Sequence, residues 1–157
     1  MIYQTILGPI EIKEENEKIT QVHYVTSQEL EKTKTSKQDK ETQLTKQTYI
    51  QITEYLERTR KEFTIPTNLR GTPFQMKVWE ELQKIPYGET RSYQDIANAI
   101  GNPKACRAVG MANHNNPISI IVPCHRVIGK NNKLVGYAGG LDIKEKLLEI
   151  EHRSAQQ

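Results

Sequence analysis

The stretch RSYQDIANAIGNPKACRAVGMAN, Arg91–Asn113, decides the fold of the second half of this chain. Ser92 and Asp95 have the spacing of a helix capping box, and apolar residues with a helical period follow them. Asn102 can cap a second helix, and Pro103 suits the first turn of that helix. Two short helices joined by a tight turn that contains glycine predict a helix-turn-helix.

The second helix of this motif is rich in small side chains. A helix that reads the major groove of DNA needs long polar side chains to reach the base edges. Small side chains instead allow a close approach to a narrow surface such as the minor groove, and Arg107 is the long side chain among them. Close packing against another helix explains the same pattern, and the helix alone leaves both interpretations open. The small residues are Ala105, Cys106, Ala108, Gly110 and Ala112.

A second informative stretch is IVPCHRVIG, Ile121–Gly129, in which a predicted buried strand leads directly into Pro-Cys-His-Arg. A cysteine is nucleophilic as the thiolate, and its ordinary pKa of about 8.5 means that Cys124 needs a base or a positive environment. His125 is adjacent, but neighbours in an extended strand point to opposite faces. The imidazole would therefore reach the thiol through a bend or a bridging water. A buried cysteine that is simply a small inert hydrophobe is the plainer alternative.

A base of this kind needs a third group to orient it. The predicted C-terminal helix offers four carboxylates, and its periodicity does not choose among them. A solvated helix face is the alternative explanation for all four. They are Asp142, Glu145, Glu149 and Glu151.

The remaining sequence predicts an α/β protein of two domains, residues 1–68 and 69–157. Residues 1–26 alternate as short strands with turns at Gly8-Pro9 and Glu15-Asn16. Residues 27–43 are polar and predict a surface excursion, residues 44–63 predict a helix stopped by Pro66, and 64–70 predict a linker. A further helix should begin near Pro73, with an apolar face formed by Phe74, Val78, Leu82 and Ile85.

Composition narrows the class of protein further. The 157 residues carry a formal net charge of +3, but Ile96–Leu141 contains no acidic residue, which suits a surface that faces phosphates. A solvated face that happens to lack acids is the alternative. No apolar run approaches a membrane span, and the N-terminus lacks the pattern of a signal peptide, so we expect a cytoplasmic protein. The two cysteines suit neither a disulfide framework nor a zinc site.

Taken in order, four segments of the chain resemble the O6-alkylguanine-DNA alkyltransferase family, the methylated-DNA–protein-cysteine S-methyltransferases. The resemblance runs from about Thr72 to Glu151 and is looser in the first 70 residues, through LGPIEI and the order of sheet then helix. It implies a ribonuclease-H-like N-terminal domain and a mainly helical C-terminal domain with the active-site cysteine. The four segments are IPYGETRSYQDIANAIGNPKACRAVG, NNPISIIVPCHRVIG, GYAGGL and KEKLLEIE.

The resemblance implies a catalytic role for four residues. Cys124 matches the cysteine that accepts the alkyl group, and His125 matches the histidine that activates it through a water. Glu151 matches the glutamate that orients this histidine, and Asn116 matches the asparagine that holds the active-site turn.

The resemblance also implies that the protein binds double-stranded DNA through the minor groove and flips the damaged base. Tyr93 matches the tyrosine that bonds the flipped guanine, and Arg107 matches the arginine that fills the gap left in the stack. Val127 and the loop Val135–Gly140 match walls of the guanine pocket. The implied set of base- and DNA-contacting residues is Tyr93, Arg107, Ala108, Gly110, Val127, Val135, Gly136, Tyr137 and Ala138.

Three departures from the family pattern stand out. Ala138 occupies a position where some relatives carry serine, and Cys106 occupies one where alanine is common. Residues 1–70 lack a Cys/His set that matches the structural zinc site of some members, since His23 is the one such residue there. We therefore expect no metal, no cofactor and a monomer that acts once per molecule on O6-methylguanine and on O4-methylthymine.

Three alternative functions share parts of this pattern. An alkyltransferase-like protein senses damage without transfer, but its family replaces the acceptor cysteine, and Cys124 is present. A sequence-specific transcription factor would need longer polar side chains on the second helix. A cysteine hydrolase with a Cys-His-Glu triad would turn over repeatedly, so a measurement of turnover distinguishes it from an alkyltransferase.

Overall fold

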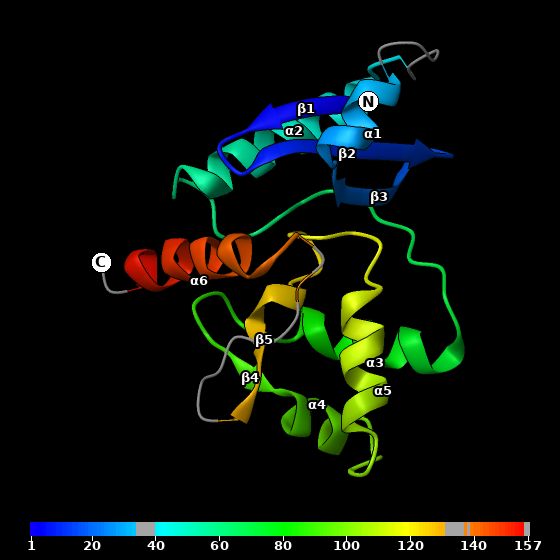
Figure 1. The fold of residues 1–157 in the computed structure, drawn as a ribbon, viewed down its shortest axis with the longest axis vertical. Helices are drawn as coiled ribbons and strands as arrows, with labels where there is room; N and C mark the ends of the chain where they lie inside the picture. Colours follow the sequence, from blue (N-terminus) through cyan, green and yellow to red (C-terminus); the bar gives the residue numbers. More distant parts are fainter. Residues whose placement is uncertain (34–39, 131–136, 138, 156–157) are drawn as a thin grey trace. The chain divides into compact units, whose positions relative to one another are not determined.

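The computed structural model describes residues 1–33, 40–130, 137 and 139–155. It divides into two compact units, Met1–Asn68 and Leu69–Gln157. The first contains a small antiparallel sheet with helices, and the second is mainly helical (Figure 1). This architecture confirms the predicted fold class.

The N-terminal unit is built on a three-stranded antiparallel sheet in the order β1-β2-β3. The strands are β1 (Ile2–Thr5), β2 (Gly8–Glu15) and β3 (Lys18–Tyr24), with Ile2 opposite Glu11 and Ile10 opposite Tyr24. Alternate residues such as Tyr3 and Ile10 are buried, as the period of two predicts. The second predicted turn is confirmed, with Asn16 and Glu17 at positive φ between β2 and β3.

The first predicted turn is displaced. The chain reverses at Ile6 and Leu7, and Gly8 and Pro9 already belong to β2. Thr5 closes this turn, because its Oγ1 donates to the carbonyl of Gly8 at 2.7 Å and accepts from the N–H of Leu7. Gly8 then takes a φ of +101°, which glycine adopts without steric cost.

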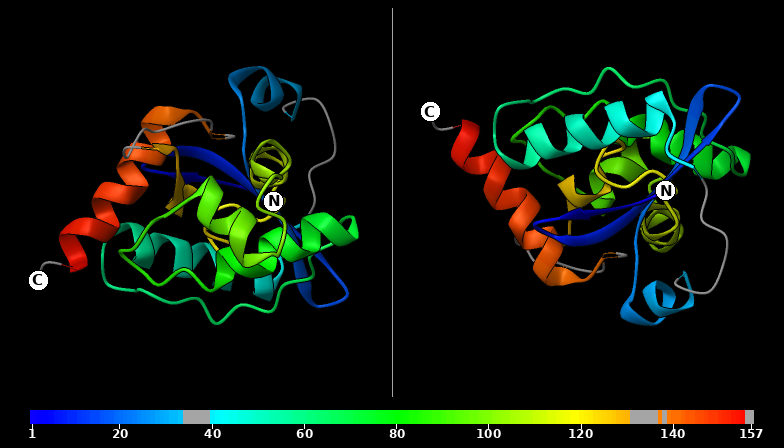
Figure 2. Two further views of the ribbon diagram at one scale, coloured as in Figure 1. Left: turned by 90° about the horizontal axis from the view of Figure 1, so that it is seen from below. Right: turned by 90° about the horizontal axis from the view of Figure 1, so that it is seen from above.

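Two helices complete this unit. α1 (Ser27–Thr33) lies in the predicted surface excursion and buries none of its residues. α2 (Gln43–Leu56) begins at a capping box of Thr42 and Thr45 and packs against the sheet through Ile52, Tyr55 and Leu56 (Figure 2). The prediction of a helix to residue 63 was wrong at its end, because Arg58 takes a left-handed conformation well before Pro66.

The C-terminal unit contains the predicted helix-turn-helix. α3 (Pro73–Gln83) packs against α5 through Val78, Trp79 and Leu82, and the indole N–H of Trp79 donates to the carbonyl of Ala112 at 2.8 Å. Ile85 is buried just after the end of α3. α4 (Tyr93–Ala99) begins at the predicted capping box of Ser92 and Asp95.

The second helix of the motif starts later than the sequence predicts. α5 (Cys106–His114) has Ala105 as its N-cap, without a side-chain cap. Asn102 is part of a turn instead, in which its carbonyl accepts the N–H of Ala105 at 3.0 Å. The small residues differ in their environment, because Ala112 is buried while Ala108 is exposed.

The prediction of a strand over PISIIV was wrong. These residues form irregular turns, although Ile118, Ile120 and Val122 are buried as expected. The strand follows the cysteine: η1 (Cys124–Arg126) is a single 3-10 turn, and β5 (Val127–Ile128) then pairs in parallel with β4 (Arg91–Ser92). α6 (Leu141–Ala155) contacts η1. No helix among the described residues is long and apolar enough to cross a membrane.

Candidate active site

The irregular segment before Cys124 is held by the side-chain amide of Asn116. Its Nδ2 donates to the carbonyl of Val122 at 2.9 Å and to that of Ile118 at 3.4 Å, and its Oδ1 accepts the N–H of Ile118 at 3.0 Å. Within this segment Ile120 has a φ of +73°, which is rare for a β-branched residue and costs about 1–2 kcal/mol. The amide therefore fixes a strained turn that ends at the cysteine.

Cys124 is a buried thiol at the first position of η1. Burial raises its pKa above the ordinary value, although hydrogen bonds to the side chains of Asn116 and Tyr137 and the charge of Lys144 act in the opposite direction. Its backbone carbonyl accepts the Asn113 amide at 3.3 Å. The thiol is therefore protonated at rest and needs a base before it can attack.

His125, the next residue of η1, pairs with Glu151. His125 Nε2 is 2.7 Å from Glu151 Oε2, and both side chains are almost fully buried. Of the four carboxylates that the sequence offered, Glu151 is the one that contacts the imidazole. Burial lowers the pKa of His125 and outweighs the opposing effect of Glu151. Since the neutral imidazole donates through Nε2 to the carboxylate, Nδ1 carries the lone pair that can accept a proton.

Arg126 binds the other side of the same carboxylate. Its Nε donates to Glu151 Oε1 at 2.8 Å and its Nη2 to Oε2 at 3.0 Å, which makes a bidentate pair. Burial alone would raise the pKa of Glu151, but His125 and Arg126 together lower it to about 2. Glu151 is therefore ionised at neutral pH.

Tyr93 and Lys144 both lie close enough to Cys124 to interact with its charge. Burial, and then the charge of Cys124, raise the pKa of the Tyr93 hydroxyl. Lys144 is fully buried on α6, its Nζ lies 5.9 Å from the centre of the Tyr93 ring, and burial lowers its pKa to about 8. A phenol that holds its proton and an ammonium group that gives up its proton more readily than usual are thus close to the thiol.

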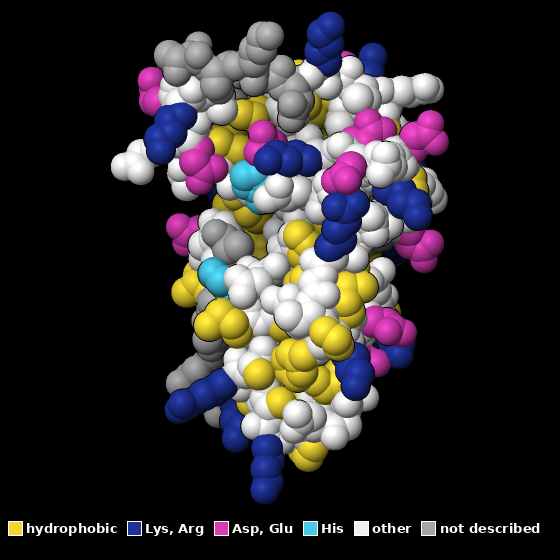
Figure 3. Space-filling view, turned by 90° about the vertical axis from the view of Figure 1, so that its right-hand side faces the viewer, with side chains coloured by type: hydrophobic (Ala, Val, Ile, Leu, Met, Phe, Trp, Pro, Cys, Tyr) yellow, Lys and Arg dark blue, Asp and Glu magenta, His cyan; other side chains and the backbone are white. Residues whose placement is uncertain are grey.

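The residues predicted to contact DNA occupy α5. Arg107 and Ala108 are exposed, and Gly110 is half-buried next to Tyr93. A Cβ added at Gly110 would lie 3.8 Å from Tyr93 Cε1, an ordinary van der Waals contact. Packing among the described residues therefore does not require glycine at this position. Figure 3 shows one face of the C-terminal unit, where hydrophobic and uncharged side chains fill the middle and Lys and Arg surround the lower end.

The predicted guanine-pocket loop is described in part. Tyr137 is buried, and so is Val127 of β5. Val135, Gly136 and Ala138 lie outside the described residues.

Two residues at the site, Asn113 and Lys144, were assigned no role from the sequence. Arg126 belongs to the acid-free segment that was predicted to face phosphates, and this prediction was wrong for Arg126, because its side chain is buried against Glu151. For Lys144 a signal was present, because it precedes Leu147 by three residues and Glu151 by seven on a helix whose buried residues follow this period. Charged residues on the apolar stripe of an amphipathic helix indicate a buried polar site. The solvated-face interpretation was therefore wrong for Glu151.

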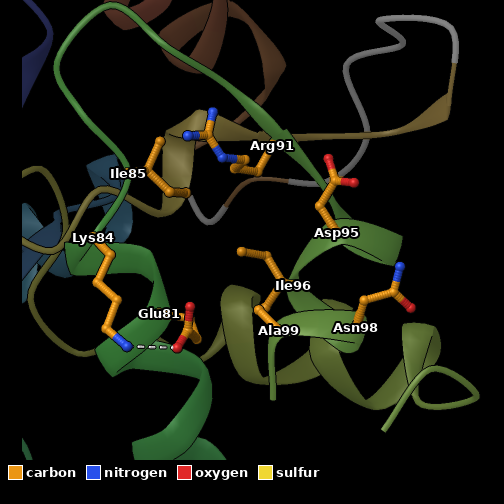
Figure 4. Close-up of a pocket in the computed structure, with 8 residues that line it drawn as sticks. All are labelled: Glu81, Lys84, Ile85, Arg91, Asp95, Ile96, Asn98 and Ala99. Carbon is orange, nitrogen blue, oxygen red and sulfur yellow. Dashed lines mark hydrogen bonds and ion pairs between the residues drawn. The ribbon is translucent and has the colours of Figure 1, made fainter. Parts of the chain in front are cut away.

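A separate pocket lies between the end of α3 and α4, with Ile85 and Ile96 at its base and the Lys84–Glu81 ion pair at one edge (Figure 4). It contains none of the predicted site residues. Its residues are Glu81, Lys84, Ile85, Arg91, Asp95, Ile96, Asn98 and Ala99.

Comparison with known families assigns both units. Residues 73–153 match the DNA-binding domain of 6-O-methylguanine DNA methyltransferase, and residues 1–69 match the ribonuclease-like domain of the same protein. The chain belongs to the 6-O-methylguanine DNA methyltransferase family.

Individual relatives are similar to this chain over nearly its whole length. The chain is 48% identical to the constitutive methylated-DNA–protein-cysteine methyltransferase of Bacillus subtilis, over 98% of this chain and 95% of the relative. It is 46% identical to a methylated-DNA–protein-cysteine methyltransferase of Methanosarcina acetivorans, over 96% of each chain. Among solved structures, Mycobacterium tuberculosis OGT in complex with DNA superposes with a TM-score of 0.86 at 41% identity, over 98% of this chain and 92% of that one.

Proposed function

We propose that this protein repairs O6-methylguanine, and O4-methylthymine, in duplex DNA by irreversible transfer of the alkyl group to its own Cys124. The observation that carries the proposal is the buried Cys124 thiol next to a His125–Glu151 pair at 2.7 Å, in a chain 48% identical to a methylated-DNA–protein-cysteine methyltransferase. The two units, residues 1–68 and 69–157, are proposed as its ribonuclease-like and DNA-binding domains.

The transfer is a single in-line displacement. The Cys124 thiol gives its proton through a water to Nδ1 of His125, and Glu151 stabilises the imidazolium that forms. The thiolate then forms a bond to the alkyl carbon as the bond from that carbon to guanine O6 breaks. The departing guanine keeps the electron pair and gains a proton, for which the Tyr93 hydroxyl and the Lys144 ammonium are the nearby donors. The thioether product is stable to water, so each molecule acts once without a cofactor.

The target must leave the base stack before this reaction. An O6-alkyl group within a duplex is out of reach of a buried thiol, and unstacking costs a few kcal/mol, less for a poorly paired base. The exposed Ala108 and the half-buried Gly110 of α5 suit a close approach to the minor groove, and the exposed Arg107 is suited to fill the gap left by the flipped base. The acid-free segment supplies sequence-independent attraction to phosphates. Val127 and the loop Val135–Gly140 are proposed as walls of the guanine pocket.

The test is the stoichiometry of repair by the wild-type protein and by Cys124→Ala, with a duplex that carries one O6-methylguanine in excess over protein. We expect one guanine restored per wild-type molecule, none by the variant, and similar affinity of both for the lesion. Repeated turnover would indicate a hydrolase instead, and tight binding without restored guanine a damage sensor. We also propose a monomer in the cytoplasm, which light scattering and cell fractionation test.

A further inference from the structure

Arg126 lies against the active site without contacting the thiol that reacts. We propose that Arg126 is a positioning residue for alkyl transfer: it neutralises Glu151, so that the carboxylate orients His125 and leaves the imidazole neutral. This inference rests on the proposed function, because it assigns His125 the task of accepting the proton of Cys124.

The geometry around Arg126 is that of a fixed clamp. Arg126 is 8% exposed, and its guanidinium donates through Nε and Nη2 to the two oxygens of Glu151. Its Nη1 donates to the carbonyl of Ile85 at 2.7 Å. The N–H of Gly88 donates to Glu151 Oε1 at 3.2 Å. Both carboxylate oxygens are thus held from the α3–α4 loop and from η1, which defines the direction from which His125 meets them.

The charges around His125 determine whether it rests neutral. Glu151 and Lys144 face it from α6, and Arg126 and Cys124 flank it in the chain. A buried carboxylate alone would hold a proton on the imidazole, because oppositely charged groups attract strongly in a medium of low dielectric. Arg126 offsets this attraction, and together with burial and Lys144 it favours the neutral imidazole.

A neutral imidazole matters because an imidazolium cannot accept the thiol's proton. Burial keeps Cys124 protonated at rest, so activation depends on a base that is unoccupied when the alkylated guanine arrives. Without Arg126, Glu151 would hold a proton on the imidazole, and His125 could not take the proton of the thiol.

The test uses three variants: Arg126→Gln, Glu151→Gln and the double variant with both changes. The pKa of His125 is measured by NMR on histidine-labelled protein without DNA. We expect an upward shift of about one unit or more in Arg126→Gln, a downward shift in Glu151→Gln, and a return toward the wild-type value in the double variant. Arg126→Lys, which keeps the charge, should stay close to the wild-type pKa.

The pH profile of single-turnover transfer gives the second readout. For each protein, the rate at pH 6 is compared with the rate on the alkaline plateau. The ratio of the plateau rate to the rate at pH 6 should be about tenfold larger in Arg126→Gln than in the wild type. Arg60→Gln, which removes an arginine from an ion pair with Glu54 in the N-terminal unit, is the matched control and should change neither readout.

Two results would overturn the proposal. One is an unchanged pKa of His125 in Arg126→Gln, and the other is a pKa in the double variant as high as in Arg126→Gln. Since the NMR titration needs no DNA, a wild-type protein that failed to transfer alkyl groups would refute the proposed function and still leave this measurement readable.

Discussion

At the scale of single residues, the site brings together titratable groups whose charged forms are disfavoured by burial. A thiol, an imidazole, a carboxylate, a guanidinium and an ammonium group are buried within one small region. Removing charged groups from water costs several kcal/mol each unless they are paired and hydrogen-bonded. The Glu151–Arg126 pair meets this requirement with near-ideal distances. Burial of the Lys144 ammonium is unfavourable for folding, as its lowered pKa indicates.

Lys144→Met should therefore raise stability and slow repair. Removal of the buried ammonium should stabilise the C-terminal unit by on the order of 2 kcal/mol at pH 7, while the loss of its positive charge should raise the pKa of Cys124 further. Because the folded pKa of about 8 lies below the ordinary 10.5, the cost is present below pH 8 and declines as the pH rises toward 10.5.

Urea unfolding at pH 7 and pH 10 and single-turnover rates measure both effects. The stability gain should shrink at pH 10. Lys146→Met, on the exposed side of the same helix, is the control. A variant that is less stable at pH 7 would show that Lys144 stabilises the fold.

The roles of some of these residues could be predicted from motifs in the sequence, and the roles of others could not. Cys124 and His125 are adjacent in a reactive tetrapeptide, so chemistry was visible in the sequence. Glu151 was one of four equivalent acids until the resemblance chose it. Asn113 and Arg126 could not have been assigned their contacts, because these depend on where a buried carboxylate and a bent backbone lie in space.

At the scale of elements, the active-site turn is the least regular segment and the one on which the cysteine depends. The sequence PISIIV predicts a strand because it is apolar and β-branched. A regular strand does not form, and the Asn116 side chain makes three hydrogen bonds with the backbone of this segment. Burial was predictable from hydrophobicity, but the path of the backbone was set by one polar side chain. The helix-turn-helix, in contrast, was predictable because its capping box and helical period are local signals.

Asn116→Ala should accordingly destabilise the protein by about 2–4 kcal/mol, because it leaves buried backbone groups without their partner, and relaxation of the strained Ile120 offsets only a small part of this loss. Transfer should be lost as the thiol moves. Chemical unfolding and transfer assays measure the two effects. Asn115→Ala changes the exposed neighbour and should alter neither. A cost below about 0.5 kcal/mol would contradict the role of Asn116 as the support of the turn.

The prediction about DNA concerns Arg107 on α5. Arg107→Ala should leave the fold intact, since Arg107 is exposed, and should slow repair of duplex DNA about tenfold or more, because the vacated stack is no longer filled. Reaction with the free base O6-benzylguanine needs no extrusion and should be unaffected. The ratio of the two rates is the measurement, and equal slowing on both substrates would exclude the proposed role.

At the scale of the whole molecule, the buried charges make stability depend on pH. The folded pKa of Glu151 is about 2, below its ordinary 4.5, so its contribution is complete above about pH 4.5 and is lost as the pH falls toward 2. The free energy of unfolding of wild type should exceed that of Glu151→Gln by about 3 kcal/mol at pH 7, and the difference should shrink steadily below pH 4.5. Urea titrations at several pH values test this. A constant difference down to pH 2.5 would contradict the ionised, clamped carboxylate.

The central claim is that Cys124 receives the alkyl group and keeps it. The most direct measurement is the intact mass of the protein after incubation with a duplex containing one O6-methylguanine, followed by peptide mapping. The account predicts one added methyl group per molecule, on the peptide that contains Cys124, with guanine restored in the DNA. An unchanged mass, or a methyl group on Cys106 instead, would contradict it.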